Sequence, residues 1–182
     1  KKRKYLKILN TVELLDGERK ISIEPHDSSL EVDFQLNYNN SIIGQQRNLV
    51  NFQNDKLEDV CNSRTFCLYE DIEKIKKAGL AKGGSLENAI VVKDDQVVNK
   101  GGLRNEKEFV NHKILDLVGD FLLSGYRILG KVKCYQGGHE LTNMFLRKLL
   151  SSKSDIISNE IIENSISKKI NTNQSIKLAV NA

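Results

Sequence analysis

The chain has 182 residues, of which 39% are hydrophobic and 29% are charged, with twelve glycines, one proline and a formal net charge of +4. This length is sufficient for one ordinary domain or two small ones, and the composition excludes a disordered or collagen-like chain. A net charge this small does not by itself indicate a nucleic-acid partner, and no apolar run approaches the ~20 residues of a membrane-spanning helix. We therefore expect a globular protein with no nucleic-acid partner and no transmembrane segment.

The cysteines and the first residue bear on where the protein acts and on how much of it is present. Cys61, Cys67 and Cys134 form neither an even set nor a Cys-x-x-Cys pair, which favours a reduced, cytoplasmic protein. The chain starts with Lys1, and its only methionine is Met144. We therefore expect the chain to be a fragment of a longer protein.

The first third of the chain has the alternating pattern of β-strands. Hydrophobic residues recur over residues 5–14, and Asp16-Gly17 is a strong signal for a hairpin turn, beyond which the alternation resumes. Residues 30–36 alternate cleanly between apolar and polar side chains, and a short strand is expected near residues 49–52. These segments predict a meander of antiparallel strands.

The pattern changes from about residue 55 onward. The spacing of the apolar residues predicts a short helix over residues 69–78. Two short strands are expected at residues 89–92 and 96–98, on either side of Asp94-Asp95.

The last part of the chain contains the strongest helix signals. Asn105 and Glu108 have the spacing of a capping box, so a helix should begin near residue 106 and end at Gly125. A strand is then expected over residues 130–135 and a second helix over residues 139–150. The chain is polar beyond that point, and its isoleucines between positions 156 and 162 predict one more weak helix. Strands followed by helices predict an α+β fold, a two-layer sandwich in which a mainly antiparallel sheet packs against helices.

One face of the first long helix carries the residues best suited to chemistry. At about 100° per residue, His112, Asp116 and Asp120 fall in one stripe, with Lys113 at its edge. A histidine and an aspartate four residues apart can ligate one metal ion, because their side chains leave the same helix face one turn apart. A third carboxylate one turn further could orient a neighbour or act as a proton partner. The same stripe is also typical of an ordinary solvated helix face, and the spacing alone does not separate the two interpretations.

A second candidate is His139, which follows Gly137-Gly138 at the start of the last helix. The positive end of the helix dipole disfavours a protonated imidazole there. A nearby carboxylate such as Asp120 would counteract that effect and produce a histidine able to act as a general acid near neutral pH. The alternative interpretation is an exposed histidine next to a helix cap.

Several short segments follow one another in an order that is typical of one enzyme family. They are Ser63-Arg64-Thr65-Phe66, Gly83-Gly84-Ser85, Ala89-Ile90-Val91-Val92, Gly102-Leu103-Arg104-Asn105-Glu106, Glu108-Phe109-Val110-Asn111-His112-Lys113-Ile114-Leu115-Asp116, Gly119-Asp120 and Gly138-His139. Over roughly residues 5–150, the chain resembles the C-terminal half of the zinc-dependent UDP-3-O-acyl-N-acetylglucosamine deacetylases. The resemblance departs from the family pattern at Asn111, where an arginine is usual, and at Cys67, where a glycine is usual.

The resemblance implies an organisation into two similar α+β domains with the active site between them. Residues 1–4 would be a linker from a missing N-terminal domain, and residues 5–150 would be the C-terminal deacetylase domain. Within it, residues 64–92 correspond to a small β-α-β insert that forms a passage for the 3-O-acyl chain. Residues 151–182 would be a polar tail.

The resemblance also implies roles for individual residues. His112 and Asp116 match two of three protein ligands of Zn²⁺, the third ligand and a glutamate base being on the missing domain. His139, Asp120 and Thr65 match catalytic residues, namely the general acid, the carboxylate that orients it and a hydroxyl that holds the oxyanion. Residues that match substrate contacts are Phe66, Lys113, Arg19 and Tyr38.

The implied function is hydrolysis of the N-acetyl group of UDP-3-O-acyl-N-acetylglucosamine in lipid A biosynthesis, in the cytoplasm of Gram-negative bacteria. With one ligand and the base missing, the isolated chain should be inactive. The alternatives are a non-catalytic α+β binding module and a degenerate homologue that keeps the fold without catalysis.

Overall fold

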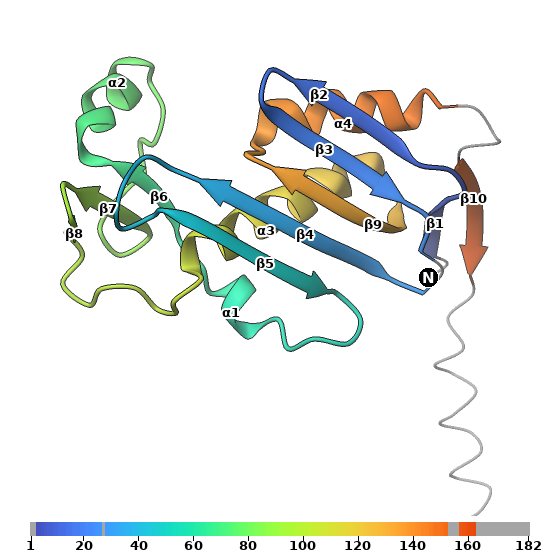
Figure 1. The fold of residues 1–182 in the computed structure, drawn as a ribbon, viewed down its shortest axis with the longest axis horizontal. Coiled ribbons are helices and arrows are strands. Elements are labelled where there is room, and N and C mark those ends of the chain that lie inside the picture. Colours follow the sequence, from blue (N-terminus) through green and yellow to red (C-terminus); the bar gives the residue numbers. More distant parts are fainter. Residues whose placement is uncertain (1–2, 27, 153–156, 163–182) are drawn as a thin grey trace, which may run out of the picture.

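A seven-stranded sheet with two helices against one face forms the main part of the molecule, shown in Figure 1. The computed structural model describes residues 3–26, 28–152 and 157–162. The sheet consists of β1 (Arg3–Ile8), β2 (Val12–Asp16), β3 (Arg19–Glu24), β4 (Leu30–Asn37), β5 (Gln45–Asn51), β9 (Arg127–Tyr135) and β10 (Ile157–Ile162). The helices on its face are α3 (Glu108–Phe121) and α4 (His139–Leu150). The predicted α+β fold is confirmed.

The strands do not form the predicted meander. The hairpin of β2 and β3 forms as expected, with Asp16 paired to Arg19 and the turn at residues 17–18, and β4 pairs antiparallel with β5. However, β9 pairs antiparallel with β3 and parallel with β4 over shared residues, so it lies between them. The prediction was wrong here because only a two-residue hairpin dictates which strands pair, whereas the longer β3–β4 connection leaves room for a strand from far along the chain.

The C-terminal segment also differs from its prediction. Instead of a weak helix, β10 pairs antiparallel with β1, with Arg3 opposite Ile162. Isoleucine favours extended backbone because its branched Cβ restricts the side chain in a helix, and this preference prevails where a strand offers backbone partners. The first residues of β1, Arg3 and Lys4, belong to the sheet although a linker was expected there. The start of the predicted weak helix, Ile156, and the predicted polar tail from residue 163 onward lie outside the residues that the structure describes.

The first long helix begins differently from the prediction. A turn precedes it, and α3 starts at Glu108 and continues through a 3₁₀ turn, Leu122–Ser124, to Gly125 with φ 75°. The expected capping box is absent, because the Glu108 carboxylate contacts Arg64 and the backbone N–H of Arg104 rather than Asn105. In its place, Asn105 accepts a hydrogen bond from the backbone N–H of Lys107. In contrast, α4 begins and ends at the predicted residues.

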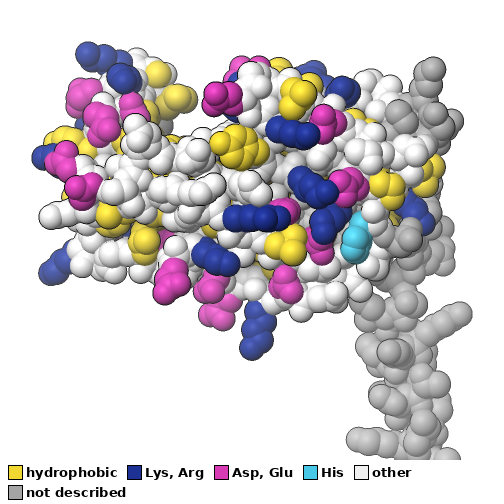
Figure 2. Space-filling view, in the orientation of Figure 1, with side chains coloured by type: hydrophobic (Ala, Val, Ile, Leu, Met, Phe, Trp, Pro, Cys, Tyr) yellow, Lys and Arg dark blue, Asp and Glu magenta, His cyan; other side chains and the backbone are white. Residues whose placement is uncertain are grey.

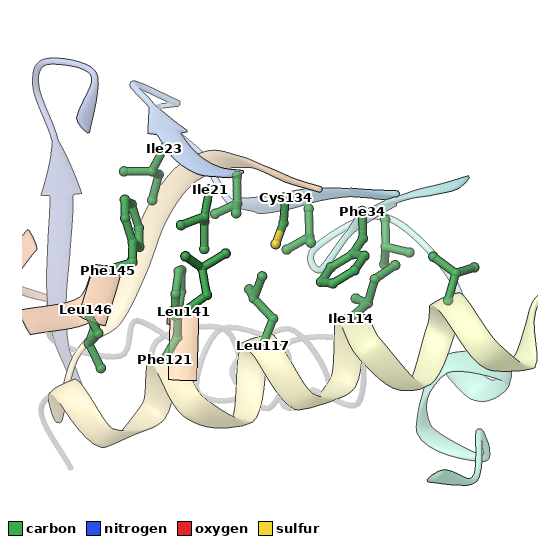
Figure 3. Packing of buried hydrophobic residues seen from close by; sticks show 14 of the residues in the cluster. Ile21, Ile23, Phe34, Ile114, Leu117, Phe121, Cys134, Leu141, Phe145 and Leu146 are labelled. Atoms are coloured by element: carbon green, nitrogen blue, oxygen red, sulfur yellow. The ribbon is translucent and has the colours of Figure 1, made fainter. Parts of the chain in front are cut away.

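The core lies between the sheet and the two helices, as Figure 3 shows. Phe34, Ile21 and Ile23 point from the strands toward Leu117 and Phe145 on the helices, and all five are almost fully buried. Each such side chain contributes about 1.5–3 kcal/mol by leaving water. This packing determines which face of α3 is covered by the sheet, and therefore which face is left for chemistry.

A smaller sheet forms the insert at one end of the molecule. It contains β6 (Thr65–Leu68), β7 (Ala89–Lys93) and β8 (Gln96–Val97), with a 3₁₀ turn, Tyr69–Asp71, and the helix α2 (Ile72–Lys77) between the parallel strands β6 and β7. The predicted β-α-β insert is thus confirmed. A short helix, α1 (Glu58–Cys61), precedes it and contacts α3.

The surface view in Figure 2 shows the insert as a lobe set off from the main part by a hollow. Basic and acidic side chains are interspersed on the visible face. Cross-strand ion pairs on the sheet contribute to this mixture, among them Lys131–Glu31 at 2.6 Å and Arg47–Asp33 at 2.5 Å. Of the helices in the described part of the chain, none has the length and apolar character needed to cross a lipid bilayer.

Candidate active site

The polar stripe predicted on α3 is present and points away from the sheet. Ile114 and Leu117, on the opposite side of the helix, are almost completely buried in the core. The side chains of His112, Asp116 and Asp120 are 15–18% exposed. Packing of the apolar side therefore orients the polar side toward a sheltered region at the surface.

His112 is held in one orientation by a backbone carbonyl. Its Nδ1 lies 3.2 Å from the carbonyl oxygen of Ser63, which can only accept, so this contact is a hydrogen bond when Nδ1 carries the ring proton. In that form, Nε2 has a free lone pair, 3.2 Å from Oδ1 of Asp116. Burial lowers the pKa of His112, although the Asp116 charge opposes that shift, so the ring is predominantly neutral near pH 7.

This pair has the properties of an incomplete metal site. With the ring proton on Nδ1, two acceptor atoms face each other, an imidazole nitrogen and a carboxylate oxygen, and a cation bound between them would stabilise the arrangement. A histidine nitrogen and an aspartate oxygen are both ordinary Zn²⁺ ligands, and an Nδ1–H bonded to a carbonyl is the usual support for such a histidine. Among the residues that the structure describes, no group of three His, Cys, Asp or Glu side chains could hold a metal ion. The donors fit Zn²⁺ but supply only part of its coordination.

His139 and Asp120 lie together, as the sequence predicted. His139 is the first residue of α4, and its Nδ1 is 2.9 Å from Oδ2 of Asp120. Its Nε2 lies 3.9 Å from Oδ1 of Asp116, the same oxygen that faces His112. The His139 side chain is 68% exposed, so its Nε2 can exchange protons with a bound molecule or with water.

The position of His139 depends on a close backbone contact at Gly137, two residues earlier. A Cβ atom on Gly137 would lie 2.3 Å from Sγ of Cys134 and 3.2 Å from Cζ of Phe34, so only glycine fits there. The backbone therefore passes directly over the core just before α4 starts. Burial also raises the pKa of the Cys134 thiol to about 12, which keeps it protonated and excludes it as a nucleophile.

Two predicted substrate residues carry positive charge near this site. Nζ of Lys113 is 3.1 Å from Oδ2 of Asp116, and its side chain is only 17% exposed. Arg19 in β3 contacts Asp16 and also Glu140, at 3.3 Å, the residue that follows His139. The structure thus brings Lys113 into the polar cluster and Arg19 to its border.

The other predicted residues lie where the insert meets the main domain. Thr65 is exposed at the start of β6, two residues after Ser63. The Phe66 ring packs edge-on against Phe109, with centroids 5.0 Å apart, and against Tyr38, with centroids 5.7 Å apart. Phe66 and Tyr38 are therefore neighbours, and both form part of the contact between the insert and the core.

An apolar cleft begins beside Thr65 and runs beneath α2. It has a volume of about 600 Å³, and its lining includes Thr65, Phe66, Ile72, Ile75, Ala89 and Val91. α2 has no buried residue, so Ile72 and Ile75 line this space without being sealed in a core. The cleft lies on the insert, as expected from the resemblance.

Sequence reasoning missed an ion pair at the base of the site. Glu108 is completely buried, and its Oε1 is 2.8 Å from Nε of Arg64. Burial alone would raise the pKa of Glu108, but hydrogen bonds from Arg64 and from the backbone N–H of Arg104 outweigh that effect and lower the pKa. The available signal was the position of Glu108 beside Phe109 and Val110 at the buried start of α3, because a charge among buried residues requires a partner.

These observations define an α+β domain in which two histidines share one carboxylate on a helix face, beside an apolar cleft. The chain belongs to the family described as LpxC: UDP-3-O-acyl N-acetylglycosamine deacetylase, whose model matches residues 1–151. The family resemblance found from the motifs is therefore confirmed.

Similar proteins agree with this assignment. Proteins named UDP-3-O-acyl-N-acetylglucosamine deacetylase match with 37% identity over 84% of this chain in a Psychrobacter species and 39% over 84% in Syntrophotalea carbinolica. The protein of that name in Pseudomonas entomophila is 41% identical over 82% of the chain. The matched regions are 52%, 49% and 50% of those relatives, so the chain spans about half the length of the curated relatives it matches.

Proposed function

We propose that this chain is the C-terminal half of a zinc-dependent hydrolase that removes the N-acetyl group of UDP-3-O-acyl-N-acetylglucosamine in lipid A biosynthesis. The observation that carries the proposal is the position of Asp116 Oδ1, 3.2 Å from Nε2 of His112 and 3.9 Å from Nε2 of His139. The proposed metal ligands and the proposed proton donor thus meet at one carboxylate oxygen. The family membership supports the substrate class, and the enzyme is expected to act in the Gram-negative cytoplasm.

Nε2 of His112 and the carboxylate of Asp116 would hold Zn²⁺, together with one ligand from a domain outside this chain. When bound, the ion supplies Lewis-acid polarisation of a water molecule and of the amide carbonyl. The Ser63 carbonyl keeps the His112 ring in the required orientation. A glutamate base on the other domain would complete the site.

His139 is the proposed general acid. Its Nδ1–H donates to Asp120, which orients the ring, so Nε2–H can be transferred to the departing sugar amine. The Thr65 hydroxyl would donate to the oxyanion that develops on the acetyl oxygen. The products are acetate and the UDP-sugar with a free amine.

The remaining residues are proposed to bind substrate. The ammonium group of Lys113 lies beside the Asp116 carboxylate, and there it would contact polar groups of the sugar. Arg19 would contact the diphosphate by exchanging its bond to Glu140, and Tyr38 would contribute ring surface to the uracil. The cleft beneath α2 would take the 3-O-acyl chain, since Ile72, Ile75 and Phe66 offer it apolar contacts.

The test compares this chain alone with the full-length protein that contains the preceding domain. The full-length protein should bind one zinc ion and release acetate from UDP-3-O-acyl-N-acetylglucosamine, whereas the chain alone should bind zinc weakly and be inactive. Tight stoichiometric zinc binding and turnover by the chain alone would overturn the two-domain proposal. A folded full-length protein that binds zinc without turnover would identify a degenerate homologue instead.

A further inference from the structure

The buried Glu108 carboxylate lies one helical turn before His112 on α3, and both residues contact the same peptide group. The peptide bond between Ser63 and Arg64 donates its N–H to Oε1 of Glu108, at 3.1 Å. The carbonyl of that same peptide bond accepts the hydrogen bond from Nδ1 of His112, at 3.2 Å. The two side chains thus hold opposite ends of one planar unit.

The carboxylate is tightly fixed. It accepts bonds from Nε of Arg64 at 2.8 Å, from Nη2 of Arg64 at 3.1 Å and from the backbone N–H of Arg104 at 2.6 Å. Nη2 of Arg64 also donates to the carbonyl of Gly102 at 2.8 Å. The Ser63 hydroxyl, in turn, donates to the carbonyl of Asp59 at 2.6 Å. The peptide group therefore has little freedom to rotate.

The arrangement has a chemical consequence for His112. The neutral ring carries one proton, and two acceptors compete for it: the Ser63 carbonyl at Nδ1 and the Asp116 carboxylate at Nε2, each 3.2 Å away. A charged carboxylate is ordinarily the stronger acceptor. The hydrogen bond that the peptide N–H donates to the Glu108 carboxylate polarises the peptide bond and strengthens its carbonyl as an acceptor.

We propose that Glu108, held by Arg64, is a positioning residue that acts through the Ser63–Arg64 peptide bond to keep the proton of His112 on Nδ1. The Nε2 lone pair is thereby left available for a metal ion. Without this relay, the proton would move to Nε2, bond to Asp116 and block the ligand pair. The metal-binding consequence rests on the proposed function, whereas the position of the proton does not.

The test is ¹⁵N NMR of the histidine rings in the metal-free chain, at a pH where the rings are neutral. It determines directly which nitrogen of His112 carries the proton. The wild-type His112 should have its proton on Nδ1. The double variant Arg64→Leu, Glu108→Leu removes both charges together and leaves no unpaired ion, and it should shift His112 to the Nε2–H form. Arg64→Lys is the matched control, because it keeps the charge and the backbone N–H, and His112 should remain Nδ1–H.

Unchanged signals from His139 would show that the fold is intact in each variant. A folded double variant in which His112 remains Nδ1–H overturns the proposal. If the double variant does not fold, the same NMR measurement is made on Glu108→Gln. A mixture of the Nδ1–H and Nε2–H forms of His112 then supports the proposal, and His112 entirely in the Nδ1–H form overturns it.

The second readout is zinc affinity in the full-length protein, which the double variant should weaken by about 10–100-fold. A shifted proton with unchanged zinc affinity would overturn the link between the relay and the metal. Absence of zinc binding in the wild-type full-length protein would instead contradict the proposed function and leave the assignment of the relay intact.

Discussion

The main domain and the insert are built in opposite ways around the same site. In the main domain, α3 has seven buried residues, and its polar face is stiffened by contacts between neighbouring side chains. In the insert, α2 has no buried residue and borders an open cleft. The proposed metal and proton chemistry thus lies on a rigid layer, whereas the proposed contacts with the acyl chain lie on an element that keeps its apolar side chains available.

The largest effect should come from removing the proposed general acid on the rigid layer. His139→Ala in the full-length protein should lower the deacetylation rate by about 10²–10⁴-fold, because it removes the proposed proton donor to the departing amine. Its side chain is 68% exposed, so stability should change by no more than about 0.5 kcal/mol. Acetate release and thermal unfolding are the measurements. His26→Ala, in the β3–β4 connection, is the control and should retain activity; equal loss in both variants would contradict the assignment.

In the insert, the largest effect is expected from a substitution that places a charge in the apolar cleft. Ile75→Asp should raise KM for the acylated substrate by about 10- to 150-fold, since burial of an aliphatic side chain is worth about 1.5–3 kcal/mol. Steady-state kinetics with and without the acyl chain is the measurement. Lys74→Asp on the solvated side of α2, where the lysine side chain is 80% exposed, should have little effect. Equal increases for the acylated and the non-acylated substrate would show that the cleft does not bind the chain.

The tight packing of the main domain can be tested by a substitution next to the site, at Gly137. Gly137→Ala should destabilise the chain by about 1–3 kcal/mol, because its Cβ would overlap Cys134. Urea unfolding measures this difference. Gly138→Ala is a matched control, as nothing lies within 4 Å of its Cβ. If both variants unfold at the same urea concentration, the contact with Cys134 does not constrain the backbone.

The smallest expected effect is a gain in stability. Gly119 lies inside α3 with nothing within 4 Å of a Cβ atom, so Gly119→Ala should stabilise the isolated chain by about 1 kcal/mol through helix propensity. A higher midpoint in urea unfolding is the expected result. A lower midpoint would mean that this helix face is more crowded than the structure indicates.

Local signals predicted the elements well, and pairing between distant segments accounts for most errors. The last helix was predicted with its observed bounds because a glycine pair precedes it and the periodicity continues to Leu150. Asp16-Gly17 predicted a hairpin because a two-residue turn involves only its own neighbours. The position of β9 between β3 and β4 was missed, because nothing within β9 specifies its partners.

In the candidate site, too, local contacts were predicted correctly and a contact between distant segments was missed. Helical spacing placed His112, Asp116 and Asp120 on one face, and the approach of His139 to Asp120 followed from the family motifs. The spacing of Glu108 from Asn105 predicted a cap, although the partner of Glu108 lies 44 residues earlier in the chain. A charged side chain adopts the role that its three-dimensional neighbours allow, and sequence spacing reports only on neighbours along the helix.

The pairing of β10 with β1 has a practical consequence for how the protein is handled. On its other side β1 is bonded to β9, so β10 satisfies backbone groups of β1 that would otherwise remain open. A version of the protein ending at residue 152 would present the open backbone edge of β1 to other molecules in solution. Such a shortened protein is expected to self-associate at high concentration, and preparations intended for crystallisation or NMR should retain the residues through Ile162.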